Sequence, residues 1–273
     1  MSISIIFVYY NTPKEIINSL KSIPASIKNL EYEVIVIDNL SPTPLPKAVS
    51  KFPNVRTIIN KENRGYGRAL NQGSKVAKGK YLLLLNPDTV FLKDSLVLMV
   101  DKMENDLSIG ILGPQFFDEK KQISITGNGM PFLPDALFAF SPLNKLFPQN
   151  PFSKKYYLTS IDRGKENEIP VICGACMLIK KSLFESIDGF DEQFFMYFEE
   201  SDLCYRVKKK GYKVLYFPKA KVIHLGGKSS DDKLWIRKVF EESRYKFFKK
   251  YHNPIGAFLG ETFLRIINNI TKL

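Results

Sequence analysis

Short apolar runs recur along the first 117 residues, and polar or amphipathic segments separate each run from the next. Runs of this length bounded by turn signals are typical of strands buried on both faces, and helical patterns between them favour parallel β-α-β units. We therefore predict an α/β protein whose mostly parallel sheet is flanked by helices. The predicted strands are 3–9, 33–38, 55–60, 81–86 and 109–116.

The pattern changes after residue 117. Residues 126–168 have no clear period and contain several prolines, which predicts a long loop or lid over a site. Regular patterns return beyond this region. The elements expected there are a strand at 171–179, a helix at 199–210, and strands at 213–217 and 222–224.

The tail from residue 233 is basic and amphipathic. Aromatic residues interleave with lysine and arginine, and a second helical stripe of apolar residues follows Pro254. Such helices either lie on an anionic membrane or pack on the rest of the chain or on another subunit, and the sequence leaves these alternatives open. We divide the chain into a domain at 1–232, with halves at 1–117 and 118–232, and a helical tail at 233–273.

Composition narrows the class of protein. A chain of 273 residues with 44% hydrophobic content can build one continuous core. The net charge of +12 favours an anionic partner, but the lysines are scattered and no compact nucleic-acid module is visible, so we expect no nucleic acid. A generally lysine-rich surface is the alternative explanation. With three cysteines, no signal peptide and no spanning segment, we expect a reduced, cytoplasmic protein.

Two predicted strands end at acids. Asp38 closes one strand, and Asp88 follows the run that ends at Asn86-Pro87. Ligands of α/β proteins bind at the carboxyl edge of the sheet, so these acids suit a metal-bound nucleotide, although Asp also caps ordinary turns. His224, which follows a short strand, is the natural second ligand for Mg²⁺ or Mn²⁺, and a purely structural histidine is the alternative.

A second acidic cluster opens the helix predicted at 199–210. Glu199, Glu200 and Asp202 follow an aromatic run. Acids at a helix start can simply satisfy free N–H groups, but one of them could instead act as a general base whose pKa is raised by its aromatic surroundings. We expect Asp202 to pair with Arg206 one turn later, which leaves Glu199 and Glu200 as candidate bases.

Several familiar motifs are missing from the sequence. The segment 9–13 reads Tyr-Tyr-Asn-Thr-Pro in place of Gly-x-Gly-x-x-Gly, and no Gly-x-x-x-x-Gly-Lys occurs, so dehydrogenases and P-loop enzymes are disfavoured. Cys173 and Cys176 could join Cys204 and His224 in a zinc site. We discount it because both cysteines lie in an apolar strand pattern, where they would serve as small buried hydrophobes.

A set of short segments occurs in a characteristic order along the chain, between Ser4 and about Gly227. These segments are 5–11, 34–39, 63–67, Asn71, Gly73, 85–88, 174–179, 189–192, 194–206 and His224. In this order they resemble family 2 of the inverting, nucleotide-sugar-dependent glycosyltransferases, which have the GT-A fold, and in particular the rhamnosyltransferase-like branch.

The resemblance implies roles for individual residues. Asp88 would bind Mg²⁺ or Mn²⁺ through the donor diphosphate, His224 would complete the metal site, and Glu200 would be the general base with Glu199 as the alternative. Two departures are Glu200 where the family usually has Asp, and Asn86-Pro87-Asp88 in place of Asp-x-Asp. The implied nucleotide-binding residues are Tyr10, Asn11, Asp38, Asn63, Gly65, Asn71 and Asn86, and the implied acceptor-binding residues are Gly174, Ala175 and Asp202.

The implied reaction is transfer of a sugar, with rhamnose as one candidate, from a dTDP or UDP donor to a glycan or a polyprenyl-diphosphate-linked acceptor in surface polysaccharide synthesis. Peripheral contact with the cytoplasmic face of a membrane through 233–273 and a homodimer are both compatible with this reading. Two alternatives are a catalytically inactive nucleotide-sugar-binding subunit and a sugar nucleotidyltransferase. The second lacks support, because no Gly-rich loop with Arg and Lys follows the first strand.

Overall fold

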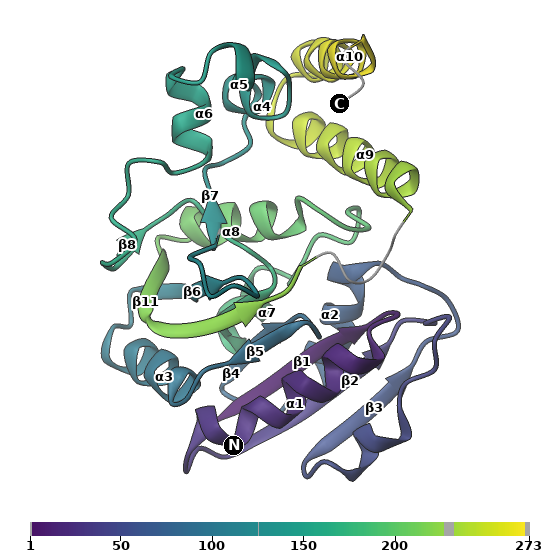
Figure 1. Ribbon diagram of the computed structural model, residues 1–273, viewed down its shortest axis with the longest axis vertical. Helices are drawn as coiled ribbons and strands as arrows, with labels where there is room; N and C mark the ends of the chain where they lie inside the picture. The colour runs from purple at the N-terminus through teal and green to yellow at the C-terminus, as the bar shows by residue number, and fades with distance from the viewer. Residues whose placement is uncertain (1, 125, 227–231, 271–273) are drawn as a thin grey trace.

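The computed structural model describes residues 2–124, 126–226 and 232–270. A nine-stranded sheet runs through its centre in the order β3-β2-β1-β4-β10-β6-β11-β5, with β8 paired on β11 (Figure 1). A two-stranded ribbon, β7 with β9, lies beside it. The strands are β1 (Ile3–Tyr9), β2 (Tyr32–Asp38), β3 (Val55–Ile59), β4 (Tyr81–Leu85), β5 (Thr89–Phe91), β6 (Ile109–Phe117), β7 (Gly127–Asn128), β8 (Asn167–Glu168), β9 (Val171–Ile172), β10 (Cys176–Lys180) and β11 (Lys213–His224).

Helices cover both faces of the sheet because alternate side chains of each buried strand point to opposite sides. In β1, Ile5 and Phe7 pack with α1 and α3, whereas Ile6 and Val8 pack in a second cluster with α2, α7 and α8. The helices are α1 (Pro13–Ile27), η1 (Lys47–Lys51), α2 (Tyr66–Val76), α3 (Ser95–Asn105), α4 (Leu133–Ala139), α5 (Leu143–Leu146), α6 (Pro151–Tyr156), α7 (Lys181–Ser186), α8 (Glu199–Lys209), α9 (Lys233–Tyr251) and α10 (Pro254–Ile270).

The strands predicted in the first 117 residues are confirmed to within one residue at each end. The sheet is mixed, however, because β10 runs antiparallel to β4 and β6, and β5 runs antiparallel to β11. The prediction of one strand over 171–179 is wrong. The chain turns between β9 and β10, where Tyr66 Oη donates to the carbonyl oxygen of Gly174 and the backbone N of Asn86 donates to that of Ala175.

The expectation of a structureless region at 126–168 is also wrong, since α4, α5 and α6 lie within it. Pro134 and Pro151 occupy the first turns of α4 and α6, where a missing N–H costs nothing. These helices are short and pack through aromatic rings, such as Phe138 stacked on Phe152, so they leave no long apolar period in the sequence.

The tail packs on the body of the protein. Phe247 and Phe248 of α9 and Leu264 of α10 share a buried cluster with Phe194 and Phe198, which precede α8. Figure 1 shows α9 and α10 at one end of the molecule, with α10 beside α4. No helix within the described ranges is both long enough and apolar enough to cross a membrane.

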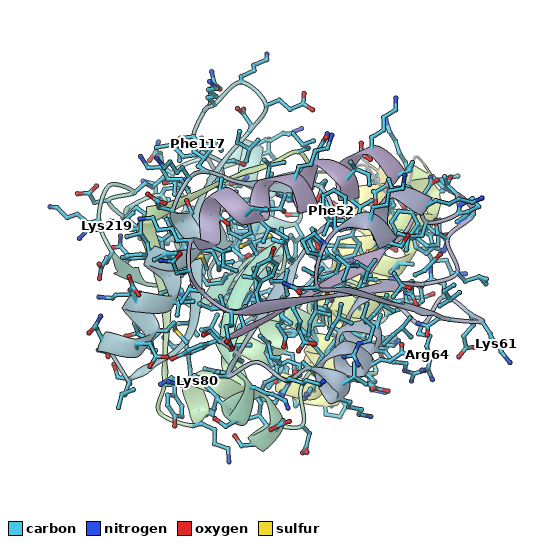
Figure 2. The ribbon with its side chains drawn as sticks, turned by 90° about the horizontal axis from the view of Figure 1, so that it is seen from below. Phe52, Lys61, Arg64, Lys80, Phe117 and Lys219 are labelled. Carbon is cyan, nitrogen blue, oxygen red and sulfur yellow. The ribbon has the colours of Figure 1, made fainter. Side chains whose placement is uncertain are left out.

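Basic side chains occur in several separate parts of the described structure (Figure 2). Lys61, Lys80 and Lys219 point outward from separate parts of the molecule (Figure 2). The spacing of these side chains agrees with the scattered lysines of the sequence.

Candidate functional site

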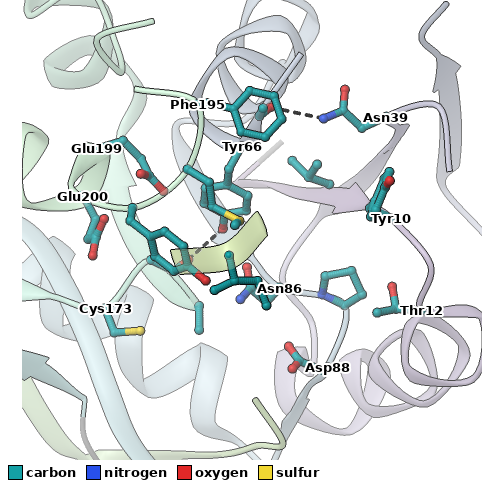
Figure 3. Close-up of a pocket in the computed structure, with 18 of the residues that line it drawn as sticks. Tyr10, Thr12, Asn39, Tyr66, Asn86, Asp88, Cys173, Phe195, Glu199 and Glu200 are labelled. Atoms are coloured by element: carbon teal, nitrogen blue, oxygen red, sulfur yellow. Dashed lines mark hydrogen bonds between the residues drawn. The ribbon is translucent and has the colours of Figure 1, made fainter. Parts of the chain in front are cut away.

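The carboxyl ends of β1, β2 and β4 open into one cavity of about 340 Å³ (Figure 3). The loop before α8, the first turn of α8, the end of β11 and the start of α9 complete its walls. The predicted site residues that line it are Tyr10, Asn63, Gly65, Asn86, Asp88, Gly174, Ala175, Glu199, Glu200 and His224. The structure therefore places Asp88 and His224, which were predicted to bind a metal, around the same cavity as Glu199 and Glu200, the predicted candidate bases.

A network of amides forms the floor of the cavity next to β2. Asn39 Nδ2 donates to Asn63 Oδ1 at 2.8 Å and to the carbonyl oxygen of Gly65 at 3.2 Å, while Asn39 Oδ1 accepts from Asn60 Nδ2 at 3.0 Å. Asn39 is almost fully buried, so these bonds hold the loop before α2 rigidly against the end of β2. This floor is polar and preformed, as a nucleotide site requires.

Gly65 is the tightest point of this floor. Its φ of +78° with ψ of 173° is a conformation that residues other than glycine rarely adopt, and a Cβ there would lie 2.3 Å from the carbonyl oxygen of Phe195. We expect Gly65→Ala to lower the free energy of unfolding by about 2–4 kcal/mol, from the backbone penalty plus the clash. Gly211→Ala is the matched control, because its φ is +85° but no described atom would meet the new Cβ within 4 Å.

Urea unfolding of the two glycine variants tests this expectation. The control should lose only about 1–2 kcal/mol. Equal losses in Gly65→Ala and Gly211→Ala would show that the close approach of Phe195 does not constrain the pocket.

Asp88 and His224 lie next to each other in another wall of the cavity. Asp88 Oδ1 lies 3.5 Å from His224 Nε2, and the backbone N of Leu225 donates to the Asp88 carbonyl oxygen at 3.1 Å. Thr89, the first residue of β5, pairs with His224 in β11, so a strand ladder fixes the spacing of the two side chains. Phe116 packs edge-on against the imidazole ring at 5.4 Å and orients it.

These two side chains fit a divalent cation that takes its other ligands from a substrate. A carboxylate and an imidazole are common ligands of Mn²⁺, and a carboxylate suits Mg²⁺. Within the described part of the chain, no cluster of three or more histidine, cysteine, aspartate or glutamate side chains could hold a metal by itself. A diphosphate would supply the missing oxygens.

Glu199 and Glu200 form the opposite wall, in the first turn of α8 (Figure 3). Burial raises the pKa of both carboxyls above the ordinary value of 4.5, and the neighbouring charge of Glu200 raises the pKa of Glu199 further. The Oε2 atom of each acid is buried and has no hydrogen-bond partner among the described residues. Because the rise in pKa is larger at Glu199, we expect Glu199 to keep its proton to higher pH than Glu200.

The segment before these acids has a strained backbone and is held in place by hydrogen bonds from α9. Tyr197 and Phe198 have φ values of +71° and +67°, a conformation that non-glycine residues seldom adopt. Helix α9 restrains them, because Ser243 Oγ donates to the carbonyl oxygen of Met196 at 2.8 Å and Lys246 Nζ to that of Gln193 at 2.8 Å. The tail thus helps to position the two carboxyls.

The raised pKa of Glu199 has a consequence for stability. In the unfolded chain this carboxyl ionises near pH 4.5, whereas the folded protein keeps it protonated to higher pH, so folding stability falls as pH rises through that window. We expect Glu199→Gln, which stays neutral, to have a higher Tm than the original protein at pH 8 and the same Tm at pH 4. Thermal scans at both pH values measure this, with the exposed Glu62→Gln as control.

The outcome that contradicts the expectation is a difference in Tm that does not change with pH. In that case Glu199 would be ionised in the folded protein, and the assignment of the proton within the pair would be reversed.

Four predicted site residues do not line the cavity. Asn71 makes two hydrogen bonds to the backbone of Phe190, at 2.9 and 2.8 Å, and so joins α2 to the loop after α7. Asp38 accepts from the backbone N of Ser41, and Asn11 Oδ1 accepts from Thr43 Oγ1 at 2.5 Å. The position of these three residues favours a role in holding loops of the site.

Asp202 is the fourth. It is fully buried and accepts from Arg206 Nε at 2.7 Å, which confirms the expected pairing. Lys250 Nζ and Tyr251 Oη of α9 also bind it. Asp202 is therefore not placed to touch an acceptor, and it joins α8 to the tail.

Sequence reasoning missed several residues that line the cavity. Trp235 and Ile236 come from the first turn of α9, and the Trp235 ring packs edge-on against Phe195 at 6.0 Å. Tyr66 donates to Gly174 from the start of α2, and burial keeps its pKa well above 10. Cys173 also lines the cavity, in the turn between β9 and β10, whereas it was expected inside a strand.

Comparison with known proteins identifies the family and the fold of this chain. Residues 4–188 match the family described as Glycosyl transferase family 2, and residues 155–227 match one described as N-terminal domain of galactosyltransferase. The N-acetylglucosaminyl-diphospho-decaprenol L-rhamnosyltransferase of Mycobacterium tuberculosis is 31% identical over 205 residues, 70% of this chain and 66% of that protein. Rhamnosyltransferase WbbL of Escherichia coli is 27% identical over 218 residues, 77% of this chain and 78% of that protein.

Solved structures share the fold. The mannosyltransferase PcManGT from Pyrobaculum calidifontis, in complex with GDP-Man and Mn²⁺, aligns over 97% of this chain and 70% of its own with a TM-score of 0.63 and 18% identity. GalNAc-T7 with UDP, GalNAc and Mn²⁺ aligns over 92% of this chain and 50% of its own with a TM-score of 0.60 and 15% identity. The chain spans just under two thirds of the mycobacterial relative. It belongs to glycosyl transferase family 2 and has the GT-A fold.

Proposed function

We propose that this chain is an inverting glycosyltransferase that moves a sugar from a nucleoside diphosphate to a lipid-linked acceptor. The observation that carries the proposal is one cavity with Asp88 and His224 on one side and the Glu199–Glu200 pair on the other. A donor diphosphate near Asp88 would place its sugar toward the acids. The Asn39 and Asn63 floor lies at the carboxyl ends of the strands, where α/β proteins bind nucleotides.

In this proposal Glu200 takes the proton from an acceptor hydroxyl. The hydroxyl oxygen then forms a bond to the anomeric carbon as the bond to the nucleoside diphosphate breaks on the opposite face, so the product has inverted configuration. The surrounding aromatic residues exclude water and keep the pKa of Glu200 above that of an exposed glutamate, which strengthens it as a base. A divalent cation, Mg²⁺ or Mn²⁺, would stabilise the negative charge on the diphosphate.

The names of the relatives favour particular substrates. Two are described as rhamnosyltransferases, and the mycobacterial name specifies an N-acetylglucosaminyl-diphospho-decaprenol acceptor. We propose a dTDP or UDP donor, with rhamnose as the first candidate sugar, and a polyprenyl-diphosphate-linked acceptor in the assembly of a surface glycan.

A substrate screen on the purified protein tests the proposal. The donors would be dTDP-rhamnose, UDP-N-acetylglucosamine, UDP-galactose and GDP-mannose, each with Mg²⁺ or Mn²⁺ and a polyprenyl-diphosphate N-acetylglucosamine acceptor. We expect one donor to release nucleoside diphosphate only when the acceptor is present, with a product of inverted configuration by NMR. Donor binding without any release would instead indicate a nucleotide-sugar-binding subunit.

A further inference from the structure

Helix α10 has an apolar side that no described part of the protein covers. Its inner side, which includes Ala257 and Leu264, is buried against α4 and α9. Its outer side carries six apolar residues, 42% to 76% exposed, each with another member three or four positions away, and together they form one stripe along the whole helix. We call these residues the outer stripe: Ile255, Phe258, Leu259, Phe263, Ile266 and Ile270. A soluble monomer seldom exposes a continuous apolar surface of this length.

The outer stripe leads to the mouth of the cavity. Helix α10 runs back along α9, because Arg237 Nη2, near the start of α9, donates to Asn269 Oδ1, at the end of α10, at 2.6 Å. Trp235, which lines the cavity, lies two residues before Arg237. Leu234, next to Trp235, is 82% exposed and adds a further apolar side chain at this point. Whatever covers the stripe will therefore lie close to the entrance of the site.

The charge around the stripe favours an anionic partner. In α10, Glu261 is the only acid, and it is buried in a pair with Arg244 at 2.8 Å and bound by Arg265 at 2.7 Å. Helices α9 and α10 together carry eight basic and three acidic residues. Two copies in contact through the stripe would bring two helix pairs of net positive charge close together, whereas an anionic bilayer would attract them.

We propose that the outer stripe, together with Leu234, seats the protein on the surface of an anionic bilayer with the mouth of the cavity facing the lipid headgroups. Amphipathic helices of this kind bury their apolar side in the interface and keep basic side chains at the headgroups. The inference rests on the proposed function, because a lipid-linked acceptor would enter the cavity from that surface. It also divides the tail into two parts: α9 completes the site, and α10 contacts the membrane.

Sedimentation with vesicles tests the inference on the full chain without donor or acceptor. Vesicles of phosphatidylcholine alone would be compared with vesicles containing 30% phosphatidylglycerol. The variant Phe258→Ser/Leu259→Ser/Ile266→Ser changes only exposed positions of the stripe, and Ile59→Ser/Leu107→Ser removes equally exposed apolar side chains on β3 and after α3. We expect the stripe variant to bind anionic vesicles at least tenfold more weakly than the original protein, and the control to bind unchanged.

Two results would overturn the inference. One is equal vesicle binding by the stripe variant and the control. The other is a dimer by light scattering that the stripe variant abolishes, without vesicle binding by the original protein, which would make a second copy the occupant. Because the vesicles contain no substrate, a protein that binds them but releases no nucleoside diphosphate in the substrate screen would contradict the proposed function and leave this inference standing.

Discussion

Replacing Glu200 by glutamine is expected to leave donor binding intact and to lower kcat by roughly 100- to 10,000-fold, the usual contribution of a general base. Glutamine keeps the size of the side chain but cannot accept a proton. In the proposed mode the donor binds on the opposite side of the cavity, around Asn39 and Asp88, so its affinity should not change. Calorimetric titration with the donor and an assay of nucleoside diphosphate release measure the two properties separately.

Glu199→Gln is the matched control for this experiment. Burial and the charge of Glu200 raise the pKa of the Glu199 carboxyl, so we expect a neutral glutamine to imitate its protonated form and most of the activity to remain. A larger loss in Glu199→Gln than in Glu200→Gln would assign the base to Glu199. Full activity in both variants would place the base elsewhere in the cavity.

Replacing Asp88 by asparagine is expected to remove the dependence of donor binding on a divalent cation. Asparagine keeps the shape of the side chain but loses the negative charge that would hold the metal next to a diphosphate. We expect the apparent affinity for Mn²⁺ in the presence of donor to fall by more than about 100-fold, since even outer-shell partners of a metal contribute 10- to 100-fold. Titration of Mn²⁺ into protein and donor, with and without chelator, measures this.

Asp101→Asn, an exposed acid on α3, should behave like the original protein and is the control. If the original protein binds its donor equally well with chelator present, the cation has no part in binding, and the proposed role of Asp88 and His224 would have to be given up.

Much of the fold could be predicted because the strands buried on both faces are continuous apolar runs, such as 81–85, that end at polar turns. The turn at Cys173–Gly174–Ala175 was not predicted, because it consists of small apolar residues that continue the pattern of the neighbouring strands. It is a turn only because Tyr66 and Asn86 bind its carbonyls from other elements. Strand β5 has three residues and no pattern of its own.

Candidate site residues could be predicted where an ionisable side chain follows the end of a strand, as Asp88 does, or begins a helix, as Glu199 and Glu200 do. Residues whose function depends on distant partners were not. Asp202 could be paired with Arg206 from its spacing, but Lys250 and Tyr251 lie more than forty positions away and leave no local signal. Trp235 looked like part of an amphipathic tail, and only packing of α9 against the loop at Phe195 brings it to the cavity.

Different kinds of contact hold the two sides of the cavity in place. A β ladder between β5 and β11 sets the position of Asp88 relative to His224, whereas Glu199 and Glu200 follow a loop that α9 holds through Ser243 and Lys246. Loosening the docking of α9, whose buried aromatic residues pack with Phe194 and Phe198, should therefore open the acidic side while the ladder stays paired, because the ladder does not depend on α9. Under the proposed function, a protein opened in this way would still capture a nucleotide but would no longer catalyse transfer, so loss of turnover would precede loss of ligand affinity.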